Sequence, residues 1–253
     1  MILIKRKSIM KKAFIVSALM GCISLPAFAN TDDSKTGIYV TGKMGASIVQ
    51  MSGQQFVYSG YADAGDNGTK NGDSHRTGVF GGGLALGYDF SNQFDIPVRA
   101  ELEFMARDKA NSTYNIRDRV RNGVHQTRDI KNQIKLNTLM VNGYYDIKNS
   151  SNFTPYISVG LGYAAVDFKT TRADAYTPGL SLHDTHTHTA NNFAWSVGAG
   201  VNYAINDDWD MGLSYRYLDA GKADITTAVG DGENTSKIKV KANDIMLGLT
   251  YRF

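Results

Sequence analysis

The chain has 253 residues, of which 42% are hydrophobic and 20% charged, with 26 glycines, 14 tyrosines and a net charge of +3. Beyond residue 30 no run of 18 consecutive apolar residues occurs, which excludes a membrane-spanning helix from that part of the sequence. The one cysteine, Cys22, excludes an internal disulfide. A chain of this length that is rich in glycine and tyrosine is typical of one all-β domain.

An export signal is predicted over residues 1–29. Five basic side chains lie in the first twelve residues, an apolar run follows, and Ala27-Phe28-Ala29 has the small-x-small pattern of a cleavage site. We expect cleavage between Ala29 and Asn30, which leaves 30–253 as a single domain. This domain has 22 basic and 24 acidic residues, so its charge does not indicate a nucleic-acid partner.

Eight segments then show the period-2 alternation of strands that are apolar on one face and polar or small on the other. In chain order they are 37–48, 78–90, 98–107, 133–147, 155–169, 193–205, 209–217 and 243–253. A soluble sandwich strand could show the same alternation. Aromatic residues at many segment ends, such as Phe90, Trp209 and Phe253, instead indicate strands that face lipid between two interfacial girdles.

The segment 98–107 carries the strongest contrast between its two faces. One face is apolar, with Leu102 and Phe104 at its centre, and the other carries four charges. Four charges on one strand face cannot lie unpaired in a soluble core, but charges from neighbouring strands can pair with them in a narrow barrel lumen. We therefore predict a lumen charge network that includes Arg99, Glu101, Glu103, Arg216 and Arg252.

The links between segments alternate in length. Those after the second, fourth and sixth segments are short turns, whereas the others run to roughly 20–30 residues, as in outer-membrane barrels with short periplasmic turns and long extracellular loops. Segment 243–253 should pair with segment 37–48 so that no sheet edge is left in the membrane. The prediction is an all-β, eight-stranded antiparallel transmembrane β-barrel with long extracellular loops.

Three stretches carry a resemblance to a known family: Gly37-Ile-Tyr-Val-Thr-Gly-Lys-Met-Gly45, Pro155-Tyr-Ile-Ser-Val-Gly-Leu-Gly-Tyr163 and the terminal Tyr-Arg-Phe253. They resemble the opacity-protein family of outer-membrane β-barrels. Within this family, the chain is most similar to the Tia/Hek/heat-resistant agglutinin adhesins. The resemblance implies a location in the bacterial outer membrane, with lipid and lipopolysaccharide as neighbours. It also implies that Phe253 is the signal recognised by the barrel-assembly machinery.

The second long link, 107–135, is the strongest candidate for a binding site. It has eight basic and three acidic residues in a domain whose total charge is −2. Guanidinium groups suit bidentate contacts to sulfate, phosphate or carboxylate, and the resemblance implies a heparin-like host glycosaminoglycan. A solvated loop that contacts lipopolysaccharide phosphates is the alternative. The predicted ligand contacts are Arg117, Arg119, Arg121, Arg128 and Lys131.

The other long links give weaker signals. His183-Asp-Thr-His-Thr-His188 could ligate zinc or copper, but a polar loop is the preferred interpretation, and we predict no metal and no cofactor. Enzyme activity is not expected, since no histidine is followed two residues later by serine as in barrel deacylases, and omptin-type proteases have ten strands. The expected function is a surface adhesin or invasin. The alternatives are a structural envelope barrel and a narrow pore.

Overall fold

The computed structural model describes residues 36–62, 67–177 and 179–253, and residues Lys35–Phe253 form one compact unit. The predicted signal peptide, with the cleavage site between Ala29 and Asn30, lies outside the described residues. Within the described ranges, no helix is both long and apolar enough to cross a membrane.

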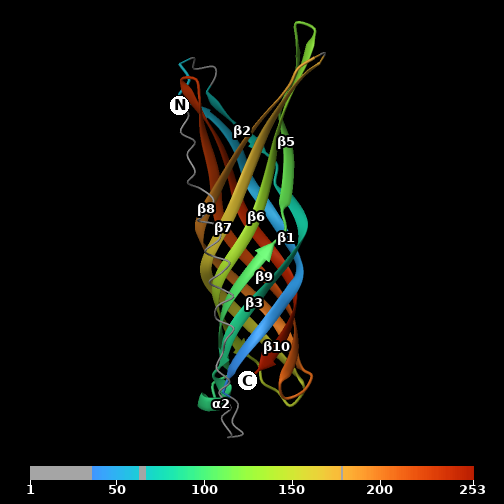
Figure 1. Ribbon diagram of the computed structural model, residues 1–253, viewed down its shortest axis with the longest axis vertical. Coiled ribbons are helices and arrows are strands. Elements are labelled where there is room, and N and C mark those ends of the chain that lie inside the picture. Colours follow the sequence, from blue (N-terminus) through green and yellow to red (C-terminus); the bar gives the residue numbers. More distant parts are fainter. Residues whose placement is uncertain (1–35, 63–66, 178) are drawn as a thin grey trace, which may run out of the picture. The chain divides into compact units, whose positions relative to one another are not determined.

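The described chain is almost entirely β-strand. Its elements are β1 (Ile38–Ser59), β2 (Gly68–Gly72), β3 (His75–Asp89), α2 (Ser91–Phe94), β4 (Val98–Arg107), β5 (Ala110–Arg121), β6 (Val124–Asp146), β7 (Phe153–Thr177), β8 (Ser181–Ala204), β9 (Trp209–Val229) and β10 (Gly232–Arg252). Eight of these strands pair in the order β1-β3-β4-β6-β7-β8-β9-β10, and β10 pairs with β1. Figure 1 shows α2 and the C-terminus at one end of the strands and the long hairpins at the other.

The closing pair is antiparallel and in the predicted place. Tyr39 lies opposite Arg252, and Ile48 lies opposite Asn243, with continuous pairing between them. Because the ring has no free edge along this stretch, every backbone group can be satisfied without water. The predicted closed barrel of eight antiparallel strands is confirmed.

The faces of the strands near the short turns are also as predicted. Outward side chains are exposed and apolar, as at Leu102 (51% exposed) and Val159 (64%), whereas the inward Glu103 is only 1% exposed. Apolar side chains on the outside and charged side chains inside are the reverse of the distribution in a soluble protein. This arrangement is stable only where lipid replaces water outside the barrel.

The long links are mostly strand instead of irregular loop. Beyond the apolar band the strands continue as an outer tier, made of β2, β5 and the parts 49–59 of β1, 124–137 of β6, 165–177 of β7, 181–192 of β8, 220–229 of β9 and 232–242 of β10. Here the polarity reverses, because the inner face is apolar and the outer face polar. The inner layer includes Met51, Ile134, Leu136, Phe168, Ala220, Ile238 and Val240, all at most 1% exposed.

The outer tier is split between β8 and β9. Their pairing ends at Trp195 and Asp219, where Gly221 adopts a positive φ of 79° that glycine accommodates without strain. The Asn192 side-chain amide donates to the carbonyls of Ala220 and Lys222 at 3.0 and 2.8 Å. The split leaves a β5–β8 lobe (β5 with the outer parts of β6, β7 and β8) and a β9–β2 lobe (β2 with the outer parts of β9, β10 and β1).

Candidate functional site

A cavity of about 800 Å³ lies between the two lobes, and we call it the outer cleft. It is lined by Tyr58, Tyr61, Asn67, Gly68, Thr69, Lys70, Ile116, Arg117, Asp118, Arg119, Arg121, Arg128, Arg172, Val229 and Asn234. The β5–β8 lobe contributes the five arginines. The β9–β2 lobe contributes the tyrosines and Lys70. The cleft is therefore cationic on one wall and aromatic and hydroxyl-rich on the other.

Like charges lie close together on the arginine wall, the side of the cleft that carries the five arginines. Arg117 of β5 lies directly opposite Arg128 of β6, an arrangement that is unfavourable for two cations without an anion between them. Partial burial, and then the nearby charges of Arg128 and Arg119, lower the pKa of Arg117. A bound anion would relieve this repulsion.

Arg128 differs from its neighbours because it already has an anionic partner. Its guanidinium donates to both carboxylate oxygens of Asp174 on β7, with the Nη2–Oδ2 contact at 2.9 Å. Burial alone would lower the pKa of Arg128, but the hydrogen bonds of Asp174 raise it above the ordinary value. Arg172 lies 3.4 Å from the same carboxylate. Asp174 thus orders this wall and neutralises about one of its charges.

The five predicted ligand residues separate into two groups. Arg117, Arg119, Arg121 and Arg128 all line the cleft, whereas Lys131 is exposed and absent from its lining. Arg119 donates to Gln126 at 3.2 Å, which leaves the rest of its guanidinium toward solvent.

Sequence reasoning missed the contributions from other hairpins. Tyr58, Tyr61 and Lys70 belong to the first long link, where the sequence indicated no binding site, and Arg172 belongs to the third. The Tyr61 hydroxyl donates to Asn234 of β10 at 3.0 Å, which fixes that ring at the cleft wall. No sequence signal joins these positions, because only the folded hairpins bring them together.

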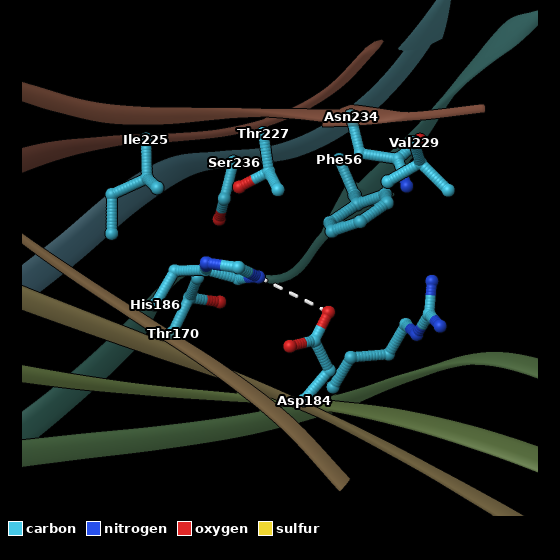
Figure 2. A pocket seen from close by; sticks show the side chains of 10 residues that line it. Phe56, Thr170, Asp184, His186, Ile225, Thr227, Val229, Asn234 and Ser236 are labelled. Carbon is cyan, nitrogen blue, oxygen red and sulfur yellow. Dashed lines mark ion pairs between the residues drawn. The ribbon is translucent and has the colours of Figure 1, made fainter. Parts of the chain in front are cut away.

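A smaller pocket of about 20 Å³ lies beneath the outer cleft, and Arg172, Val229 and Asn234 line both (Figure 2). Figure 2 shows His186 beside Asp184, their Nε2 and Oδ2 atoms 3.1 Å apart, facing Ile225 and Phe56. Among the described residues no group of three or more histidines, cysteines or acids is placed to hold a metal ion.

Charged side chains cross the lumen within the apolar band. Lys43 contacts Glu101 and lies 2.7 Å from Glu103. Glu103 also pairs with Arg216, whose Nη2 is 2.9 Å from Asp244. Arg107 lies 2.6 Å from the same Asp244 carboxylate, and both of these side chains are fully buried. The two cavities beside this network hold about 30 Å³ each, which is room for a water molecule or two.

Nearer the short turns, Arg99 and Arg252 have separate partners. Arg99 donates to both oxygens of Asp146 at 2.7 and 2.8 Å, and Arg252 lies 2.6 Å from Asp89 and from Asp210. All five predicted network residues therefore point inward, but only Glu101, Glu103 and Arg216 belong to the central cluster. The partners Lys43, Asp89, Asp146 and Asp210 were not among the predicted network residues, although their strand positions already placed at least three of them inward.

An eight-stranded ring with apolar side chains outside and paired charges inside defines an integral β-barrel of the bacterial outer membrane. The family model described as the outer membrane protein beta-barrel domain matches residues 15–253, and the chain belongs to this family. The protein accordingly resides in the outer membrane, as the sequence predicted.

Known proteins that are similar to this chain include the following three. Outer membrane protein PagN of Salmonella typhimurium is 39% identical over 231 residues, which cover 90% of this chain and 94% of PagN. A protein of Rickettsia typhi named as a candidate adhesin is 24% identical over 115 residues, 45% of this chain and 49% of its own. Neisserial surface protein A matches with a TM-score of 0.49 and 16% identity over 86% of this chain and 98% of that structure.

Proposed function

We propose that this protein is an adhesin or invasin that binds heparin-like polyanionic glycans of host cells in the outer cleft, chiefly through the arginines of β5. The observation that carries the proposal is the pairing of an arginine wall with a tyrosine wall across one cavity. An inorganic polyanion would need only the cations. A sulfated sugar also offers apolar ring faces, which aromatic side chains cover.

The cleft has the size and the free charges for this ligand. Its volume of about 800 Å³ is in the range of small-molecule sites. Arg117, Arg119 and Arg121 present guanidinium groups that can hold sulfate or carboxylate oxygens in pairs. Lys70 adds a cation from the opposite wall, and Arg172 adds one from the arginine wall. Arg128, held by Asp174, is better suited to position the wall than to bind ligand directly.

The experiment compares two sets of charge removals in a non-adherent bacterial strain that displays the protein. One variant replaces Arg117, Arg119 and Arg121 with serine, and the matched control replaces Lys131 and Lys135, which are exposed on the outer face of β6. We expect the arginine variant to lose heparin binding roughly tenfold or more, since three charge-assisted contacts are removed. The control should change little.

Heat-modifiable migration on gels checks that each variant is still a folded barrel. Binding should weaken as salt rises, because exposed charges are screened. Equal losses in both variants would show that general surface charge, and not the cleft, retains heparin. Unchanged binding in the arginine variant would overturn the proposal and leave the alternative of a structural envelope barrel, whose deletion alters detergent or bile sensitivity.

A narrow pore is the less favoured alternative. The ion pairs fill the lumen within the apolar band, and the apolar layer around Leu136 and Phe168 lies above them. An ion would have to shed its water to cross that layer. We likewise propose a binding role and not an enzymatic one.

Phe253 is proposed as the signal for the assembly machinery. Its backbone nitrogen donates to the carbonyl of Ile38 at 3.0 Å, and its ring contacts Tyr251 at the end that carries the short turns. Phe253 is 43% exposed, so it is accessible to a partner.

A further inference from the structure

Two lysines face each other across neighbouring strands on the outside of the outer tier. Lys239 of β10 is the direct partner of Lys222 of β9, and both side chains are exposed. Like charges directly opposite each other on an antiparallel pair are destabilising. Among the described residues, neither side chain has an ion pair with a carboxylate at 4.0 Å or less.

Irregularities in both neighbouring strands produce this arrangement. The register between β10 and β9 shifts between Lys239 and Lys241, where Gly221 has its positive φ. The register between β1 and β10 shifts at the same level, where Gly53 has a φ of 56°. A Cβ at Gly53 would lie 3.5 Å from the Lys239 side chain, an ordinary contact distance, so the lysine stem lies alongside this bulge. Bulges re-aim side chains in this way.

The lysine pair lies just above the outer edge of the lipid-facing band. Going outward along β10, the exposed apolar Ile245 is followed on the same face by Asn243, Lys241 and Lys239. The ammonium of Lys241 lies 5.7 Å from the ring of Tyr217, which contacts Trp195. Such aromatic residues mark the membrane interface. Two residues further out, the pair lies about 7 Å along the strand from that girdle.

The surrounding charges leave an excess of cations at this level. Lys237 and Lys241 flank Lys239 on the same face of β10, and Asp224 lies opposite Lys237. Asp219 is 3.7 Å from Lys241 and also accepts from the Gly221 backbone. The two acids can therefore neutralise the flanking lysines, and Lys222 and Lys239 are left to share an external anion.

We infer that Lys222 and Lys239 form a binding site for a phosphate of the lipid A headgroup of lipopolysaccharide in the outer leaflet. Each ammonium can donate up to three hydrogen bonds to phosphate oxygens. A phosphate placed between the two converts their repulsion into two charge-assisted contacts. Headgroup phosphates lie just above the hydrocarbon, which is the level of this pair. This site is separate from the outer cleft and does not depend on the glycan proposal.

The test compares the full barrel with its Lys222→Gln, Lys239→Gln double variant in micelles, with and without added lipid A. The control is Lys131→Gln, Lys135→Gln, which removes two exposed lysines from β6. Without lipid A the double variant should unfold at the same temperature as the parent or higher, because a repulsion is gone. With diphosphoryl lipid A the parent should gain stability, and the double variant should bind about tenfold more weakly.

Two further ligands identify the source of the phosphate. Monophosphoryl lipid A and phosphatidylglycerol should each bind the parent more weakly than diphosphoryl lipid A, and the loss on substitution should be smaller with them. Equal binding of phosphatidylglycerol would overturn a lipid A site in favour of general attraction to anionic lipid. Equal losses in the β6 control, or no loss in the double variant, would also overturn the inference.

Discussion

Asp244 is the carboxylate whose removal should destabilise the barrel most. Its Oδ2 atom accepts from Arg107 and Arg216 at 2.6 and 2.9 Å, and its side chain is fully buried. Asp244→Asn keeps the shape but removes the charge. Arg107 would then retain only neutral acceptors, which are the hydroxyls of Ser47 and Thr138 and the amide oxygen of the asparagine. Leaving a buried charge without its partner costs about 3–5 kcal/mol, and we expect a loss of that size.

The assay is reversible unfolding by urea in lipid vesicles, followed by tryptophan fluorescence. Glu233→Gln, an exposed carboxylate on the same strand, is the control and should change stability by less than about 0.5 kcal/mol. Arg107→Met combined with Asp244→Leu removes both charges and should recover at least half of the loss. The reasoning is refuted if Asp244→Asn costs under about 1 kcal/mol. It is also refuted if the stability losses of Arg107→Met alone and Asp244→Leu alone simply add in the double variant.

Three other predictions concern the outer tier. Asp174→Asn should raise heparin affinity a few-fold, seen as elution at higher salt, because the cleft gains a free cation at Arg128; weaker binding would contradict this. Asn192→Ala should cost about 1–3 kcal/mol by leaving two carbonyls without a donor, and faster amide exchange in β9 would report it. Burial raises the pKa of Tyr114 to about 12, so between pH 10 and 12 this side chain ionises in the unfolded state and not in the folded state, and stability should fall. The fall should be smaller in Tyr114→Phe, and ultraviolet titration would follow the ionisation.

The membrane part of the fold could be predicted in detail because lipid outside the barrel and the polar lumen inside it impose a strict alternation of apolar and polar side chains. On β7, Ile157, Val159 and Leu161 are exposed to lipid where the period-2 pattern places them, and Ser158 and Gly160 between them face inward. The outer tier was harder to predict. Its strands keep the same alternation but exchange polarity, with polar side chains outside and apolar ones inside. β6 therefore continues to Val124, although the predicted segment 133–147 ended at Gln133.

The candidate site shows a different limit. The arginines of β5 stand out by charge density in one short stretch, and the structure brings them to one cavity. Asp174 is 46 positions from Arg128, and only the β6–β7 register makes them neighbours. Tyr58 and Lys70 have no unusual sequence context. Residues that act together across several hairpins cannot be grouped until the pairing of those hairpins is known.

The exchange of polarity along β6 also determines how deeply the protein sits in the membrane. Leu139 and Val141 are exposed on the outer face, and Lys135 and Lys131 follow on that same face. A shift of four residues toward the periplasm would bring Lys135 to the level of Leu139 in the hydrocarbon, and a shift outward would expose leucine to water. The barrel therefore has one favoured depth. Since Arg128 is about 30 Å further along the strand than Asn137, the rigid sheet holds the outer cleft at a constant height above the bacterial surface.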